Sequence, residues 1–587
     1  MVPVRRTIVS LVLALLTLCA ALAGRQPAVS YVVTPDVGAR SYHVSMSVRD
    51  VHSSPLEVRI PAWCPGWYVL TEYHKNIRRV SAKTASGVRL QVDEEGDRVW
   101  RVENRGASGV VVEYQVRGND AGFGFFGSHL SERNGFVNPA SLCMYPTGRT
   151  QEPVSIRFDL PSGWNIATAL DEGGREGEFV AQDYDELVDS PFELGHFKRV
   201  DFEAAGVPMF VTFTYRGEMR PNAEKIVSEL KLIAETQIAM FGGAPMKRYF
   251  WNIHLDTGSF GGGLEHRAST TLNVQNSADL DIRWLASHEF FHLWNVKRIR
   301  PKLLGPFDYT GPQRTGNLWF AEGVTSYYGD LTLYRAGMID REQWLRTITN
   351  QIETLQNSSD RLKYSAEEAS RRAWEGGSQG YGNLSYYNKG FLIGLLLDLS
   401  IRTRTAGEKS LDDVMRHMLK KHAPPKPGYD EDGILVAINE VTGLDFTPLY
   451  TRLARTTEEL PYSEVFTAAG LRYGGGEQGE SGLTLVLAGA QAYPRVQEVS
   501  PNSMAESMGL QPGDFIVSVN GTDARGSADP LAGIGSGDEV VISALRRSQK
   551  LSLTGTMGSR SASGTTLALS PNPTPLQQRI LDGWLKR

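Results

Sequence analysis

The stretch LASHEFFHLWNVKRIRP, residues 285–301, carries two histidines four positions apart, with a glutamate directly after the first. On a helix, His288 and His292 lie on one face and can direct two imidazole nitrogens at one metal ion, with Glu289 beside them. In a chain with 11 histidines the pattern arises by chance in about one case in a hundred. The alternative is an amphipathic helix whose two histidines hydrogen-bond to their neighbours.

A catalytic zinc site of this type needs a third protein ligand. The residues after His292 contain no further histidine at the metzincin spacing, but NLWFAEGVTSYYGDL, residues 317–331, supplies Glu322 within an apolar helical segment. Such a carboxylate is either an ordinary surface glutamate or an inward-facing one that needs a buried partner. Two histidines, one glutamate and an open water position are typical of thermolysin-like catalysis, with Glu289 placed as the general base.

Two further motifs hold candidate site residues. SYYNKGFLIGLLLDL, residues 385–399, begins with Tyr386 and Tyr387, which are either residues at the edge of a core or donors to a developing oxyanion. SFGGGLEHRAST, residues 259–270, places Glu265 after three glycines, where a backbone can approach a ligand closely. Each of these signals is weak by itself.

The chain of 587 residues is too long for one hydrophobic core, and its patterns predict a multidomain α+β protein. Residues 24–205 alternate short apolar stretches with turn residues, which indicates a β-sandwich-like domain. Residues 206–460 are mainly helical in pattern. Helices are expected over 280–296, 317–336, 341–356, 384–402, 410–421 and 446–456.

The C-terminal part resembles a PDZ domain. SPNSMAESMGLQPGDFIVSVNG, residues 500–521, has the order of that family: a short helix, a Gly-Leu turn, Pro-Gly-Asp, an apolar strand and Asn-Gly. The domain is expected over residues 465–560, with the glycine-rich stretch 473–482 as a linker or loop. A tail over residues 561–587 is expected to end in a helix.

The N-terminus predicts export. Arg5 and Arg6 precede an apolar run over residues 8–23 that ends in a small-residue pattern, so residues 1–23 are expected to be a signal peptide. Because the run is shorter than the roughly 20 residues that span a bilayer, no permanent membrane anchor is expected, and the protein is predicted to be periplasmic or extracellular. Cys64 and Cys143 could then form a disulfide or remain as buried thiols.

Charge gives little further indication of function. The net charge is -5 with no long run of one sign, which does not favour nucleic-acid binding. The short basic run of Lys297, Arg298 and Arg300 is interpreted as cations that favour the C-terminus of a helix.

Together the motifs resemble a known family. GGLEH, HEFFH, WFAEG and YNKG occur in the order of the gluzincin aminopeptidases. The continuation HLWNVKRIRP, the N-terminal string IPAWCPGWYV and the PDZ module make the resemblance closest to the PDZ-containing glycyl aminopeptidases, the sixty-first metallopeptidase family.

This resemblance implies a thermolysin-like peptidase domain with one zinc ion per chain. Carried over residue by residue, it implies that His288, His292 and Glu322 bind zinc and that Glu289 is the base. It also implies that Tyr387 stabilises the oxyanion and that Glu265 holds the free α-amino group of the substrate.

Two departures from the family pattern stand out. His266 replaces the asparagine after Glu265, which bears on how the amine is held. The gap between His292 and Glu322 is long, so an inserted loop, LLGPFDYTGPQRTG at residues 303–316, is expected to shape the mouth of the site.

The expected function is that of an exported aminopeptidase that acts on peptides or proteins and removes small N-terminal residues, Gly or Ala. A protein C-terminus is a possible ligand of the PDZ domain. Two alternatives stay open: an endopeptidase whose PDZ domain captures substrates, and a non-catalytic peptide-binding protein.

Overall fold

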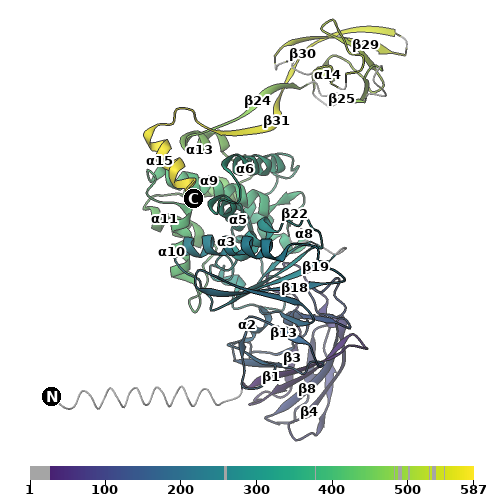
Figure 1. Cartoon of the computed structure of the whole chain (residues 1–587), viewed down its shortest axis with the longest axis vertical. Coiled ribbons are helices and arrows are strands. Elements are labelled where there is room, and N and C mark those ends of the chain that lie inside the picture. Colours follow the sequence, from purple (N-terminus) through teal and green to yellow (C-terminus); the bar gives the residue numbers. More distant parts are fainter. Residues whose placement is uncertain are drawn as a thin grey trace, which may run out of the picture.

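The computed structural model describes residues 27–256, 261–376, 379–480, 483–486, 492–499, 503–527, 529–531, 534, 537–547 and 549–586. Figure 1 shows a β-rich part at the N-terminal end, a largely helical part in the middle and a small β-rich module at the far end. The predicted signal peptide, residues 1–23, lies outside the described residues. In the ranges described, no helix is both long and apolar enough to cross a bilayer.

The N-terminal part is built from strands that alternate buried and half-buried side chains, as in β1 (Val29–Asp36). Its largest sheet has eight strands in the order β14-β15-β12-β1-β2-β8-β4-β5, and two four-stranded sheets lie with it around one core. The other elements are β2 (Ser41–Val48), β3 (Leu56–Arg59), β4 (Ile77–Thr84), β5 (Arg89–Leu90), β6 (Val92–Glu94), β7 (Val99–Val102), β8 (Val110–Arg117), β9 (His129–Leu130), β10 (Asn134–Val137), β11 (Tyr145–Pro146), β12 (Val154–Phe158), β13 (Asn165–Ala167), β14 (Asp171–Glu172), β15 (Glu178–Ala181), α2 (Tyr184–Val188) and β16 (Phe192–Gly195).

Cys64 and Cys143 are free thiols buried in this core, not a disulfide. Burial raises the pKa of the Cys64 thiol to about 12. Both side chains therefore behave as small apolar residues.

A five-stranded sheet, which the sequence patterns did not predict, begins the middle part. Its order is β17-β18-β19-β21-β20, with β18, β19 and β21 parallel and β20 antiparallel at the edge. The strands are β17 (Lys198–Ala204), β18 (Val207–Tyr215), β19 (Tyr249–Asp256), β20 (Gly262–Glu265) and β21 (Ser269–Gln275). Helix α3 (Ala223–Phe241) lies between β18 and β19 in the chain and buries an apolar face that includes Ile226, Leu230 and Ile233.

Apart from the short strand pair β22 (Gly380–Tyr381) and β23 (Leu384–Ser385), the rest of the middle part is mainly helical and shares one large core with the sheet. The helices are α4 (Arg283–Phe291), η4 (Trp319–Val324), α5 (Thr325–Arg335), α6 (Arg341–Gln356), α7 (Ala366–Arg371), α8 (Ala373–Gly376), α9 (Tyr386–Arg404), α10 (Leu411–His422), α11 (Gly433–Thr442), α12 (Thr447–Tyr450), η5 (Thr451–Arg455) and α13 (Tyr462–Ala468). Three predicted helices differ from those observed. Helix α4 ends at Phe291, and η4, a π-helical turn, precedes α5 in the segment predicted as one helix. The segment 446–456 consists of α12 followed by the π-helical turn η5.

The C-terminal module is inserted between two long strands, β24 (Leu471–Glu480) and β31 (Gly558–Leu569), which pair with each other. The glycine-rich stretch predicted as a linker is thus strand up to Glu480, because β31 supplies its backbone partners. The module has its own small core and contains β25 (Leu483–Val486), β26 (Arg495–Val499), α14 (Met504–Ser507), β27 (Phe515–Val519), β28 (Thr522–Asp523), β29 (Glu539–Arg546) and β30 (Gln549–Thr556).

After β31 the chain returns to the helical part. Figure 1 shows the β24–β31 ribbon joining the module to the helices, with α15 (Pro575–Trp584) back among them. Trp584 is fully buried, and its indole Nε1–H donates to the Tyr327 hydroxyl at 3.0 Å. The expected terminal helix is therefore part of the core of the middle part.

Candidate active site

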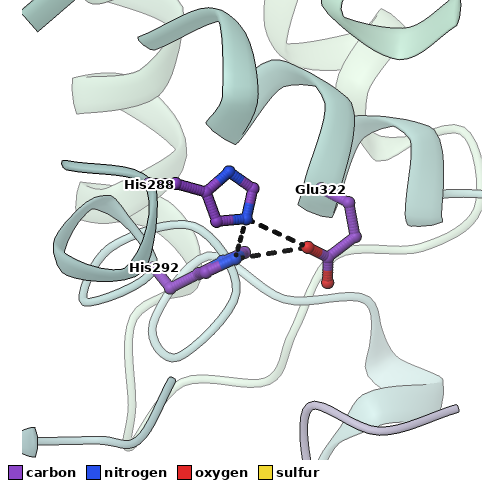
Figure 2. A group of neighbouring side chains, drawn as sticks. All are labelled: His288, His292 and Glu322. Carbon is purple, nitrogen blue, oxygen red and sulfur yellow. Dashed lines mark hydrogen bonds and ion pairs between the residues drawn. The ribbon is translucent and has the colours of Figure 1, made fainter. Parts of the chain in front are cut away.

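Helix α4 and the π-helical turn η4 bring two imidazoles and one carboxylate together. The Nε2 atoms of His288 and His292 are 3.0 Å apart, and Glu322 Oε2 lies 3.6 Å and 3.2 Å from them. Figure 2 shows the three side chains converging on one point. All three are buried, and this is the ligand set that the sequence predicted.

Outer contacts fix which ring nitrogens carry protons. His292 Nδ1 lies 2.7 Å from the Asn295 carbonyl oxygen, which can only accept. Ser326 donates its hydroxyl to the Glu322 carbonyl, so its oxygen accepts from His288 Nδ1 at 3.2 Å. Both Nε2 lone pairs therefore face the same point, which is unfavourable unless a cation lies between them. These residues fit a zinc ion.

The backbone after α4 explains why His292 reaches this position. His292 is the C-terminal capping residue of α4, and the chain then turns through Asn295. The Asn295 side chain donates to the Phe320 carbonyl at 2.8 Å and to the Thr325 hydroxyl at 3.1 Å. This amide links the end of α4 to the turn that carries Glu322, and π-helical turns of this kind are frequent at functional sites.

Tyr68, from the N-terminal part, touches Glu322, the predicted third ligand. Its hydroxyl donates to Glu322 Oε1 at 3.2 Å, while Oε2 faces the two histidines. Burial alone would raise the pKa of Glu322, but the nearby His292 and His288 outweigh it and hold that pKa below its ordinary value. Glu322 is therefore an anion suited to a cation.

Glu289 is buried beside these three predicted ligands. Burial, with the nearby Glu265 and Glu322 carboxylates, raises its pKa well above the ordinary value, although His292 opposes this. Its Oε2 has no hydrogen-bond partner among the described residues. Strand β20 leaves room for this side chain only because residue 263 is glycine: a methyl group there would collide with the Glu289 carboxylate. A carboxylate with an unused oxygen can accept a proton from water.

Glu265 lies at the end of edge strand β20. Its Oε1 is 3.5 Å from the Lys297 ammonium, and Lys297 also donates to Asp189 Oδ1 at 2.9 Å. His266 contacts the same Asp189 oxygen through Nδ1 at 3.3 Å. One Glu265 oxygen also lies within 4.8 Å of ligand atoms of Glu289 and His292, so Glu265 borders the predicted metal site.

The basic run after α4 is therefore not a set of cations at a helix end. Lys297 is buried between two carboxylates, and Arg298 is buried and donates to three backbone carbonyls. Burial lowers the pKa of Arg298 to about 9. The prediction was wrong because α4 ends at Phe291, before this run.

Both tyrosines of the SYYNKG segment, residues 385–390, lie in the first turn of α9. The half-buried Tyr387 ring faces the His288 ring, and their centroids are 6.1 Å apart. The Tyr386 ring is fully buried, and its centroid lies 5.0 Å from that of Tyr387. Burial and the Glu322 carboxylate raise the pKa of Tyr387 well above its ordinary value, so its hydroxyl keeps its proton and can donate.

A cavity of about 670 Å³ lies between the N-terminal and middle parts and borders Glu265, Lys297 and Tyr68. Leu304, Gly305, Pro306 and Phe307 form part of its wall. The inserted loop at residues 303–316 thus lines a cavity next to the candidate site.

Family models match three parts of the chain. The Peptidase M61 N-terminal domain matches residues 30–196, the M61 glycyl aminopeptidase matches residues 281–393, and a PDZ domain matches residues 495–547. The chain is an M61 peptidase. The family prediction and the multidomain α+β fold are thereby confirmed, and this M61 chain is a hydrolytic enzyme.

Solved structures are similar over most of the M61 chain. The crystal structure of an aminopeptidase N family protein from Idiomarina loihiensis has 27% identity and a TM-score of 0.74, covering 95% of this chain and 100% of that one. A variant of an M1 zinc metallopeptidase from Deinococcus radiodurans, bound to a Tyr-Ser-Ala substrate, has 14% identity and a TM-score of 0.49. The match covers 74% of this chain and 95% of that one. No curated protein matches the sequence.

The sequence patterns missed four side chains around the site: Tyr68, Asp189, Lys297 and Ser326. Ser326 lies four residues after Glu322, and a helical wheel could have placed it on the same face. Tyr68 lies within IPAWCPGWYV, which was noted only as a family string. Asp189 and Lys297 belong to different domains, so no short stretch of sequence contains both residues and shows their contact.

Proposed function

We propose that this peptidase is a zinc aminopeptidase. The observation that carries the proposal is the convergence of His288 Nε2, His292 Nε2 and Glu322 Oε2, whose outer contacts leave both imidazole lone pairs free for a cation. One zinc ion held there would act as a Lewis acid on the scissile carbonyl and lower the pKa of a water molecule.

The protein side chains then have separate roles. Glu289 accepts a proton from the attacking water and passes it to the leaving amine. Tyr387 donates a hydrogen bond to the oxygen of the scissile carbonyl as negative charge develops on it. Glu265 pairs with the α-ammonium group of the substrate, and its Oε1 has no hydrogen-bond partner among the described residues.

The substrate preference and location are also part of the proposal. We propose that the enzyme releases small N-terminal residues, Gly or Ala, in keeping with the glycyl aminopeptidase model that matches residues 281–393. Export to the periplasm or outside the cell rests on the charged and apolar pattern of residues 1–23. The PDZ domain is proposed to bind polypeptides, for example by a C-terminus.

One comparison of substrates tests the aminopeptidase reaction. We expect a glycine-terminated peptide to be cleaved much faster than its N-acetylated twin, because only the free amine can pair with Glu265. Comparable rates would overturn the proposal in favour of an endopeptidase. Separately, dialysis against a strong chelator should abolish activity and added zinc should restore it; fresh, active enzyme that contains no zinc would refute the cofactor.

A further inference from the structure

Lys297 forms a buried link between two carboxylates of different domains. Its ammonium donates to Asp189 Oδ1 at 2.9 Å and lies 3.5 Å from Glu265 Oε1. Asp189 follows α2 of the N-terminal part, whereas Glu265 ends β20 of the middle part. All three groups are buried, and charges in such surroundings need partners.

Glu265 is also held from its other side. Its Oε2 faces the backbone of Gly66, where φ is +89° and an added methyl group would come within 2.7 Å of that oxygen. The carboxylate thus has an N-terminal backbone on one side and the Lys297 ammonium on the other.

The link does not use all the acceptor capacity of Glu265. An ionised carboxylate offers about four lone-pair positions, and Oε1 has no hydrogen-bond partner among the described residues. The carboxylate also borders the cavity of about 670 Å³. Glu265 therefore keeps lone pairs that Lys297 does not use, and a second ammonium group can bind to them.

We propose that Lys297 and Asp189 are positioning residues that hold the Glu265 carboxylate in place to receive the α-ammonium group of the substrate. The inference rests on the proposed aminopeptidase function. Because Lys297 donates a hydrogen bond to Asp189, its ammonium interacts with Glu265 only at the longer distance. The cation thus orients the carboxylate and leaves acceptor positions on it free. A purely structural ion pair would instead affect every substrate equally.

Two small inhibitors that differ only in the amine isolate this effect. Glycine hydroxamate and acetohydroxamic acid present the same metal-binding group, and only the first carries an α-ammonium. In the wild-type enzyme we expect glycine hydroxamate to have the lower inhibition constant, and in Glu265→Gln this preference should disappear. Absence of any preference in the wild type would refute the amine site itself, and with it the proposed function.

The test variant is the double substitution Lys297→Met with Asp189→Asn, which removes both members of one ion pair and leaves no lone partner between them. We expect the preference for glycine hydroxamate to fall about 10-fold, the scale of one hydrogen bond to a charged group. The inhibition constant of acetohydroxamic acid should stay unchanged. With the glycine-terminated peptide, KM should rise more than kcat falls.

A milder variant and a control complete the experiment. Asp189→Asn alone lets Lys297 move onto Glu265, so the preference should fall even if the double variant does not fold. Lys302→Met, which removes a cation paired with Asp430 on the surface, should change neither constant. A preference retained in Asp189→Asn and in the double variant, but lost in Glu265→Gln, would overturn the positioning role and leave the proposed function standing. An equal loss for both inhibitors would also overturn it.

Discussion

Tyr68 and Glu322, which lie in different domains, meet at the proposed metal site: the phenol donates to Glu322 Oε1 at 3.2 Å. The N-terminal part therefore touches a proposed zinc ligand directly. Tyr68→Phe should keep the fold and weaken zinc binding about 10-fold, the usual scale for an outer contact to a metal ligand. Titration with a competing chelator would measure this change, and an unchanged zinc affinity would show that Glu322 is held without the phenol.

Glu289 should be separable from the metal. Glu289→Gln removes the proton acceptor but none of the proposed ligands, so zinc content should stay at one per chain while turnover falls by at least about 100-fold. Gly263→Ala should also lower turnover, because the added methyl group displaces the Glu289 carboxylate. Metal analysis together with kcat tests both variants. A Glu289→Gln enzyme of near-normal rate would exclude Glu289 as the base.

The two tyrosines of α9 should differ in their effect. Tyr387→Phe keeps the ring that faces His288 and removes only the hydroxyl, so the rate should fall roughly 100- to 1000-fold with little change in stability. Tyr386→Phe is the matched control in the adjacent, fully buried position. If Tyr386→Phe showed the loss and Tyr387→Phe did not, the oxyanion donor would be Tyr386.

The PDZ module should be removable without loss of the chemistry. Glu480 and Gly558 are paired in the β24–β31 ribbon, so residues 481–557 can be replaced by a two-residue Asn-Gly turn that closes the ribbon. Hydrolysis of a dipeptide-sized reporter should stay nearly unchanged, whereas cleavage of long polypeptides should weaken. Equal loss on both substrate sizes would mean that the module supports the catalytic part.

Asp330 should make stability depend on pH. Burial raises its pKa from 3.8 to about 7. Between these two pH values the Asp330 carboxyl is therefore neutral in the folded chain and ionised in the unfolded chain. Its contribution to stability is therefore lost as pH rises from about 4 to 7. Asp330→Asn should raise the free energy of unfolding at pH 8 by on the order of 1–4 kcal/mol and change it little near pH 4. Urea unfolding at both pH values tests this, and equal changes would contradict it.

Local patterns predicted the parts of the site that lie within single segments. The spacing of His288 and His292 and the apolar setting of Glu322 each belong to one short stretch, and the structure brings these three together. Lys297 was misinterpreted because its partners lie 108 and 32 residues away in the sequence. The periodicity of a helix or strand relates only residues within one element.

The five-stranded sheet escaped prediction for a similar reason. Strand β19 is buried at almost every position, so it shows no alternation of apolar and polar residues. Strand β20 is short and starts with glycines, which favour a loop when judged alone. Pairing with β21, not its own propensity, makes β20 a strand.

The burial of Trp584 sets an order of events during synthesis. Its ring fills the space beside Trp344, and its indole binds Tyr327 in the helix that follows Glu322. The core beside the proposed zinc site is therefore completed by a residue that is synthesised after the PDZ module.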